Sequence, residues 1–258
     1  RYFNDVEQDS IFFFLLASEE TVKFLYELDE SIATRLIENE TPERLAKIME
    51  QASSNEQVFL MGLVSDQFAT SVIDLLQAEE QEELEEMMAY PEDSAGILMY
   101  TDVFTLHEET KAREAIYALQ DQEDAEMVFY LYTLDDDGSL TGVISLRDLV
   151  TTPGETMLKD IMSKNIQAVR PETDQEEVAR IVSQYNFLAV PVVDADEKLL
   201  GIVTVDSVVD VIREEATEDF LQLAGAGKDR EILLKSSWEN ARIRLPWLFA
   251  SWVGGILA

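Results

Sequence analysis

The chain has 258 residues, of which 53 are Asp or Glu and 19 are Lys or Arg, so its formal charge is −34. Cysteine is absent and histidine occurs once, which excludes disulfides, Cys-ligated zinc, thiol catalysis and sites built from several histidines. The negative charge argues against nucleic acid as a partner, because phosphates would be repelled, and favours either solubility or the binding of cations.

The N-terminal third of the chain predicts helices only. Apolar residues recur there at helical spacing, as in Leu45, Ile48 and Met49. Thr41 followed by Pro42 is a typical helix start, with threonine as the N-cap and proline in the first turn. Short helices with polar joints are typical of stacked α-hairpins. We therefore expect an all-α superhelical domain over residues 1–95.

An internal repeat follows this helical region. The two copies read LDDDGSLTGVISLRDLV from Leu134 and VDADEKLLGIVTVDSVV from Val193. The matched pairs, each 59 positions apart, are Asp135 and Asp194, Gly142 and Gly201, Ser145 and Thr204, and Asp148 and Ser207. One offset across a whole motif indicates a duplication. We expect two similar α/β domains, over residues 96–154 and 155–212.

Each copy predicts a helix, a strand, a turn, a second strand and a final helix. The predicted helices are Lys111–Leu119 and Gln175–Tyr185, and the predicted strands are Val128–Leu134, Val143–Leu146, Leu188–Val193 and Ile202–Val205. The run from Asp135 to Gly138 predicts the turn of the first hairpin. Thr173 and Glu176 have the spacing of a capping box.

The C-terminal part of the chain predicts a polar connecting helix over residues 213–240 and an apolar segment over residues 241–258. The apolar run is too short to span a bilayer, which needs about 20 residues. Its paired Trp and Gly residues, and the arginines just before it, are typical of the start of a transmembrane helix with its upstream side in the cytoplasm. We expect such a truncated first transmembrane helix; a buried C-terminal helix is the alternative.

The repeat resembles a pair of cystathionine-β-synthase (CBS) domains. Each copy has a strand, then Gly, two hydrophobic residues, Ser or Thr, and a helix, and the first copy also has the Asp three positions after its Ser. The whole chain resembles the cytosolic part of the MgtE family of magnesium channels and transporters. The motifs that carry this resemblance are YPEDSAGILM from Tyr90, ISLRDL from Ile144, TDQEEVAR from Thr173, GIVTVD from Gly201 and EATED from Glu215.

The resemblance implies an α+β multidomain chain: a superhelical α-hairpin domain, tandem CBS domains and a connecting "plug" helix before the membrane. It also implies a homodimer, joined through the CBS domains, that forms the cytoplasmic side of a multi-pass protein of the cell membrane. In this family the cytosolic domains sense Mg²⁺ and close the protein's own transmembrane pore when Mg²⁺ is high. We find no catalytic constellation and do not expect an enzyme.

A chain rich in Asp and Glu is well suited to bind Mg²⁺. This ion prefers oxygen ligands, keeps several waters and needs only one or two carboxylates per site. The ligands that the resemblance implies are the side chains of Asp174, Glu176, Asp210, Glu215, Glu218 and Asp219 and the backbone oxygen of Gly96, which the family would pair with Asp210. The alternative for Asp174 and Glu176 is favourable charge at a helix N-terminus, and for the others an exposed, solvating charge.

The N-terminal domain departs from the family pattern. Gln51 and Asn55 stand where an Asp pair, spaced four apart, would be expected to meet the plug helix. Neutral amides bind a cation more weakly than carboxylates, so we name no metal ligand in this domain.

ATP or another adenine nucleotide is the second ligand we consider, because CBS pairs often bind such nucleotides between their repeats. The candidate residues are Tyr130, Ser145, Arg147, Asp148 and Thr204. Tyr130 would stack on the base, Ser145 and Arg147 would contact phosphate, and Asp148 would accept from ribose. Helix capping by Ser145 and core packing by Tyr130 are the alternatives. A nucleotide-sensing module and a purely structural dimerisation domain therefore remain rival functions.

Overall fold

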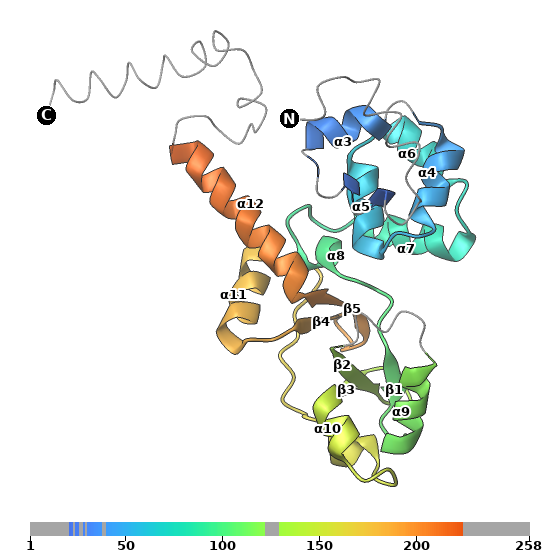
Figure 1. The fold of residues 1–258 in the computed structure, drawn as a ribbon, viewed down its shortest axis with the longest axis vertical. Helices are drawn as coiled ribbons and strands as arrows, with labels where there is room; N and C mark the ends of the chain where they lie inside the picture. Colours follow the sequence, from blue (N-terminus) through green and yellow to red (C-terminus); the bar gives the residue numbers. More distant parts are fainter. Residues whose placement is uncertain are drawn as a thin grey trace, which may run out of the picture. The chain divides into compact units, whose positions relative to one another are not determined.

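A computed structural model of the chain describes residues 21–22, 24–25, 28, 30–37, 40–121 and 129–223. It confirms the predicted α+β class (Figure 1). The chain divides into two compact units, Arg1–Val208 and Val209–Ala258, and each is described by itself. The predicted membrane segment at 241–258 lies outside the described residues. Among the helices that the structure describes, none is both long and apolar enough to cross a bilayer.

Short helices make up the described part of the N-terminal region, as predicted. They are α3 (Glu30–Ile37), α4 (Pro42–Met49), α5 (Ser54–Gly62), α6 (Asp66–Ile73) and α7 (Ala78–Met88). Helix α4 begins where the sequence predicts, because the hydroxyl of Thr41 accepts a hydrogen bond from the backbone N–H of Arg44 at 3.4 Å. The helices turn Leu45, Met49 and Leu60 into the core, where all three are fully buried.

The first repeat folds around a three-stranded sheet. Its elements are α8 (Ala95–Leu98), β1 (Thr105–His107), α9 (Ala112–Gln120), β2 (Tyr130–Leu134), β3 (Leu140–Ser145) and α10 (Leu146–Thr151). Strand β2 lies in the middle, parallel to β1 and antiparallel to β3. Strand β3 begins three residues before the predicted Val143 and ends one residue before the predicted Leu146, because Ser145 caps α10 there.

The helices and strands of the second repeat follow the same order, except that in the described chain an isolated parallel bridge between Val169 and Val192 stands in place of β1. Its elements are the 3₁₀ turn η2 (Leu158–Asp160), α11 (Gln175–Tyr185), β4 (Ala189–Val193), β5 (Leu199–Thr204) and α12 (Val205–Leu223). Strands β4 and β5 pair antiparallel, and every residue of β4 is buried. The bounds of α11 are those predicted. The polar helix predicted from residue 213 is not a separate element in the described chain, since α12 already begins at Val205.

The start of α11 corrects the predicted capping box. The N-cap is Asp174, not Thr173, and its carboxylate accepts a hydrogen bond from the N–H of Glu176 at 2.9 Å. The hydroxyl of Thr173 instead accepts from the N–H of Arg170 at 3.0 Å. A carboxylate is a strong N-cap because it accepts from the free N–H groups of the first helical turn.

The two hairpin turns are built alike, as the repeat predicts. The Asp135 carboxylate accepts from the N–H groups of Asp137 and Ser139, and the Asp194 carboxylate accepts from those of Asp196 and Lys198, at 2.9–3.0 Å. Gly138 has a left-handed φ of +81°, and the equivalent Glu197 has a φ of +62°. The duplicated Asp side chains therefore hold the same turn even where glycine is missing.

Each repeat also completes the sheet of the other. Tyr100, at the start of the first repeat, exchanges two backbone hydrogen bonds of 2.8 and 2.9 Å with Ile202 of β5. Ser163, at the start of the second repeat, exchanges two of 3.1 and 2.9 Å with Val143 of β3. The glycine of each motif makes room for this crossing: a Cβ on Gly201 would lie 2.6 Å from the carbonyl oxygen of Tyr100.

Candidate functional site

Three of the predicted metal ligands lie on two segments that pair where the chain enters the repeats. Here residues 92–96 lie against residues 171–176, and we call this contact the Gly96 junction. Its three backbone hydrogen bonds run from the N–H of Gln175 to the oxygen of Asp93 (2.9 Å), from that of Ala95 to Thr173 (2.8 Å), and from that of Gly96 to Pro171 (2.8 Å). The pairing brings Ser94 opposite Asp174, at the start of α11, whereas Gly96 itself lies against Pro171.

The side chains of the Gly96 junction are mostly acidic and accessible. Asp174 and Glu176 are exposed. Glu92 and Asp93, on the opposite segment, are exposed as well; the sequence analysis did not select them, although they belong to the YPED motif. Gly96 itself is buried under Tyr90, whose ring would lie 2.4 Å from a Cβ at this position. Only glycine lets the backbone approach this closely.

The remaining predicted metal ligands lie on α12. Asp210 and Arg213 are exposed and form an ion pair of 3.5 Å. Glu215 is half-buried. Glu218 and Asp219 are on the described helix backbone, but their side chains lie outside the described residues. The role of all of these residues as ligands stays a prediction.

Among the described residues, no three His, Cys, Asp or Glu side chains converge as a metal cluster would require. In the N-terminal domain, Gln51 is exposed, whereas Asn55 is 6% exposed and its side-chain oxygen accepts from the hydroxyl of Ser53 at 2.8 Å. Asn55 therefore serves the start of α5.

Four of the five predicted nucleotide residues meet at one end of the first repeat's sheet. Tyr130 and Ser145 are register partners across β2 and β3. The Ser145 hydroxyl accepts from the N–H of Asp148 at 3.1 Å and donates to its carboxylate at 2.7 Å. Arg147 and Asp148 are both exposed. The hydroxyl of Tyr130 reaches the second repeat, accepting from the N–H of Leu188 at 3.5 Å.

The fifth residue, Thr204, lies at the equivalent place in the second repeat but is fully buried, with its hydroxyl 3.2 Å from that of Ser207. Its register partner is Ala189, where the first repeat has Tyr130. The second repeat thus lacks the aromatic ring and the exposed acid of the first. That one nucleotide site would be built mainly by the first repeat stays a prediction.

Tyr132 is a polar residue that the sequence analysis did not select. It is 1% exposed, its hydroxyl has no hydrogen-bond partner among the described residues, and its ring packs edge-on against that of Tyr130 at 6.5 Å. Burial raises the pKa of Tyr132 well above its usual value, so the phenol stays neutral. The sequence could have pointed to Tyr132, because it lies two residues after Tyr130 and this spacing places both rings on one face of β2.

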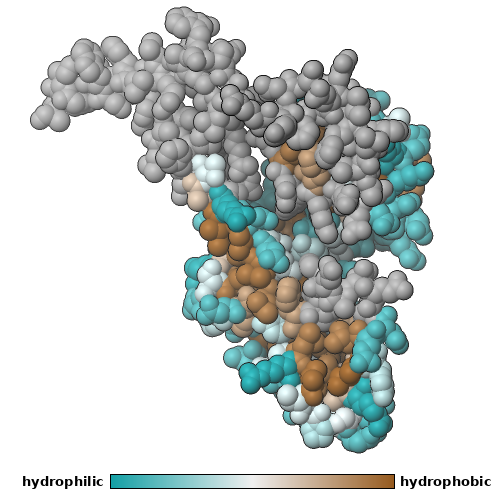
Figure 2. All heavy atoms as spheres, viewed as in Figure 1, coloured by the Kyte–Doolittle hydropathy of each residue, from teal (hydrophilic) through white to brown (hydrophobic). Residues whose placement is uncertain are grey.

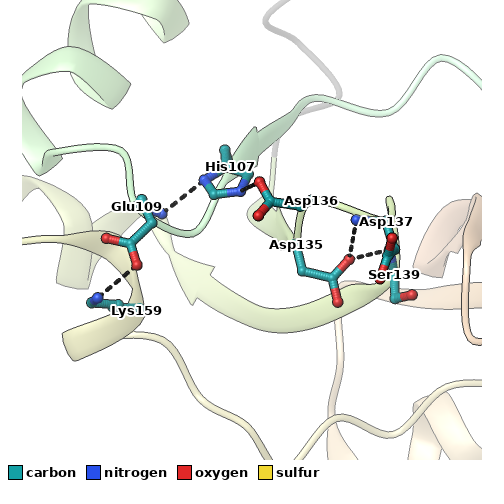
Figure 3. A network of polar contacts seen from close by, with 7 residues as sticks. All are labelled: His107, Glu109, Asp135, Asp136, Asp137, Ser139 and Lys159. Carbon is teal, nitrogen blue, oxygen red and sulfur yellow. Dashed lines mark hydrogen bonds and ion pairs between the residues drawn. The ribbon is translucent and has the colours of Figure 1, made fainter.

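A second polar surface lies at the opposite end of the first repeat (Figure 3). His107 Nε2 is 3.1 Å from a carboxylate oxygen of Asp136, and Nδ1 accepts from the N–H of Glu109 at 3.2 Å. The ammonium of Lys159 donates to the Glu109 carboxylate at 2.7 Å. This contact lowers the pKa of Glu109 and raises that of Lys159, so both stay charged near neutral pH.

Comparison with known sequence families agrees with this organisation. The profile of the MgtE intracellular N domain matches residues 3–93, and that of the CBS domain matches residues 95–154 and 158–214. The magnesium transporter MgtE of Enterococcus faecalis is 42% identical over 172 residues, and that of Thermus thermophilus is 43% identical over 151 residues. These matches cover 66% and 58% of this chain but only 38% and 34% of the two transporters.

Solved structures show the same likeness over more of the chain. The cytosolic domain of the Mg²⁺ channel MgtE in complex with ATP is 34% identical, with a TM-score of 0.76 over 80% of this chain and 85% of that one. The soluble part of a magnesium transporter is 29% identical, with a TM-score of 0.64 over 82% of this chain and all of that one.

Proposed function

Because the chain belongs to the MgtE family and matches its cytosolic region, we propose that it senses Mg²⁺ for a magnesium channel or transporter and closes the membrane pore when Mg²⁺ is abundant. The observation that carries this proposal is the Gly96 junction. Its backbone hydrogen bonds join the segment that contains Gly96 to the segment that leads into α11, where Asp174 and Glu176 lie, and carboxylate and backbone oxygens are ligands of the kind that Mg²⁺ prefers.

The proposed mechanism is electrostatic. Without metal, the acids on facing segments repel one another and favour an open form of the cytosolic region. With Mg²⁺, the bridged carboxylates favour a compact form. Shifting such an equilibrium from 1:99 to 99:1 takes about 5.5 kcal/mol of differential binding. Several weak sites supply this together, at about 1–2 kcal/mol each once the ion exceeds its dissociation constant several-fold.

The proposal includes a homodimer on the cytoplasmic face of the cell membrane. Each repeat exposes an apolar residue at the same place on its last helix: Val150 on α10 is 67% exposed and Val209 on α12 is 40% exposed. Figure 2 shows apolar surface over the described part of α12. Exposed apolar side chains at repeat-related positions support association through these helices, because a twofold dimer uses the same surface on both chains.

Adenine-nucleotide sensing is the second candidate function. It is favoured by the cluster of Tyr130, Ser145, Arg147 and Asp148, which offers an aromatic face, a hydroxyl, a cation and a carboxylate within one site. The similar structure that was solved with ATP supports the same candidate. In this role the acidity of the chain would serve only its solubility.

Small-angle X-ray scattering separates these functions when the protein is titrated with MgCl₂ alone and, in a second series, with the sodium salt of ATP in EDTA. The Mg²⁺ sensor predicts a smaller radius of gyration at millimolar Mg²⁺ without nucleotide. Compaction with ATP alone would instead select the nucleotide sensor. A radius that responds to neither ligand would leave only the structural dimerisation domain.

Replacing Asp210 and Glu218 together with alanine should raise the midpoint of the Mg²⁺ titration about fivefold, which corresponds to about 1 kcal/mol. The effect is moderate because Arg213 already offsets part of the charge of Asp210 in the wild type. The scattering titration measures the midpoint. An unchanged midpoint would remove both residues from the list of ligands.

A further inference from the structure

The N-terminal helices share one hydrophobic core with the second repeat. Leu45, Leu60 and Leu84, from α4, α5 and α7, belong to the same buried cluster as Val190 of β4 and Val203 of β5. The first repeat has a separate core, formed around β2, β3, α9 and α10. Among the described residues, the N-terminal domain therefore shares its core with the repeat that comes later in the chain.

Helix α8 connects the N-terminal domain with this second repeat. It contacts α5 and α7 of the domain and α11 of the repeat. Its residue Ala95 and the following Met99 are buried in the shared core. Tyr100 then exchanges two backbone hydrogen bonds with Ile202 of β5, at 2.8 and 2.9 Å. The chain thus leaves the N-terminal domain attached to the second repeat.

Thr101, the next residue, is held by two side chains of the N-terminal domain. Its backbone N–H donates to Oγ of Ser54, at the start of α5, at 3.1 Å. Its hydroxyl oxygen lies 2.5 Å from the same Oγ, and its hydroxyl donates to the carboxylate of Glu83 on α7. Because the single hydroxyl hydrogen of Thr101 goes to Glu83, the hydroxyl of Ser54 is the donor to Thr101. We call these three residues the Thr101 cluster.

The crossing at the start of the second repeat has a different residue at this place. Residues 156–164 repeat residues 93–101 at an offset of 63. The matched residues of the two crossings are Met99 and Met162, Tyr100 and Ser163, and Thr101 and Lys164. Ser163 keeps the two backbone hydrogen bonds of the crossing, with Val143, but Lys164 is exposed. The crossing itself therefore needs no hydroxyl after it, and the Thr101 cluster is an addition that serves the N-terminal domain.

We propose that the Thr101 cluster couples the N-terminal domain to β5 and so to α12, which begins at Val205 directly after this strand. Thr101 is held by the N-terminal domain, and its neighbour Tyr100 pairs with β5. When the domain moves away, the cluster breaks and the pairing of Tyr100 with Ile202 weakens. None of the three residues is a predicted metal ligand, so this contact is separate from the metal sites. The inference rests on the proposed function for its role in gating, and adds the contact through which the N-terminal domain acts on α12.

Thr101→Val tests the coupling, because valine has the shape of threonine but lacks its hydroxyl. In excess MgCl₂, amide hydrogen exchange should become about fivefold faster at Tyr100, Thr101 and Ile202, equivalent to about 1 kcal/mol. Exchange at Val143 and Ser163, the equivalent amides of the other crossing, should not change. Nuclear magnetic resonance measures these amides separately.

Variants of the other two residues show whether the cluster acts as a unit. Ser54→Ala should speed exchange by a similar factor, and adding Thr101→Val should have no further effect, because either change opens the same cluster. Glu83→Gln should keep most of the protection, since its amide oxygen still accepts from Thr101, whereas Glu83→Leu should not. Thr70→Val is the matched control: the Thr70 hydroxyl donates to the backbone oxygen of Asp66 within α6, so its removal should leave the crossing unchanged.

Thr101→Val should also raise the midpoint of the Mg²⁺ scattering titration about threefold, because the compact form loses a contact that the ion does not supply. An unchanged midpoint, unchanged exchange at Tyr100 and Ile202, or additive effects of the Ser54 and Thr101 changes would each overturn the inference. Failure of the proposed function looks different. The wild type would then have the same radius of gyration in EDTA and in MgCl₂, while the effects of the variants on exchange would remain.

Discussion

Replacing Asp174 with Asn and Glu176 with Gln should raise the Mg²⁺ concentration needed for half-maximal compaction about thirtyfold. Two carboxylate contacts of about 1 kcal/mol each account for this shift. Asparagine is as good an N-cap as aspartate, so α11 keeps the cap that Asp174 provides. The change therefore removes charge from the Gly96 junction while the helix start is retained. X-ray scattering across a MgCl₂ titration measures the midpoint.

The matched control is Asp102→Asn with Asp121→Asn, which removes the same charge from two exposed residues elsewhere in the first repeat. Its midpoint should shift less than twofold, because surface charges far apart are screened by salt. Equal shifts in the two double variants would mean that the compaction by Mg²⁺ depends on net charge alone. This result would contradict a site at the Gly96 junction.

Replacing Gly201 with Ala should lower the free energy of unfolding by about 2–4 kcal/mol. The new Cβ would lie 2.6 Å from the carbonyl oxygen of Tyr100 and 3.1 Å from Met99. A backbone carbonyl cannot rotate away as a side chain can, so β5 and Tyr100 must separate. The two hydrogen bonds between Tyr100 and Ile202 would weaken with this movement. Urea denaturation followed by circular dichroism measures the loss.

Two further Gly-to-Ala variants calibrate this result. In Gly142→Ala the three atoms nearest to the new Cβ all belong to the side chain of Met162, which can adapt, so the cost should be about 1–2 kcal/mol. In Gly62→Ala nothing lies within 4 Å, and helix α5 should become slightly more stable. A Gly201→Ala protein as stable as the Gly62→Ala protein would show that the crossing segment is not held against β5.

Local sequence signals predicted much of this fold. The capping preference of Thr41, the spacing of the apolar residues and the offset of 59 between the hairpins identified helices, strands and the duplication. The second offset, of 63, escaped notice because nine residues separate α9 from β2 in the first repeat, whereas only three separate α11 from β4 in the second. That shift hid the likeness between residues 93–101 and 156–164, and with it the two matching crossings.

The candidate sites were less predictable, because their residues come from distant segments. Tyr130, Ser145 and Asp148 share one hairpin and helix start, so a local motif was enough to group them. The segments that contain Gly96 and Asp174 are far apart in the chain and are joined by backbone pairing, which periodicity does not reveal. The cap at Asp174 was misplaced by one residue because Thr173 is also a good capping residue.

The crossing of Tyr100 onto β5 and of Ser163 onto β3 has a consequence for how such proteins can evolve or be engineered. A single copy cut from the chain would lose the segment that covers one edge of its sheet, and the bare edge would invite aggregation. Gene fusion or domain grafting should therefore succeed only when both repeats are transferred together. The unit that is inherited is therefore the pair of repeats. The two repeats can differ in charge, as they do here, while each still needs the other to cover the edge of its sheet.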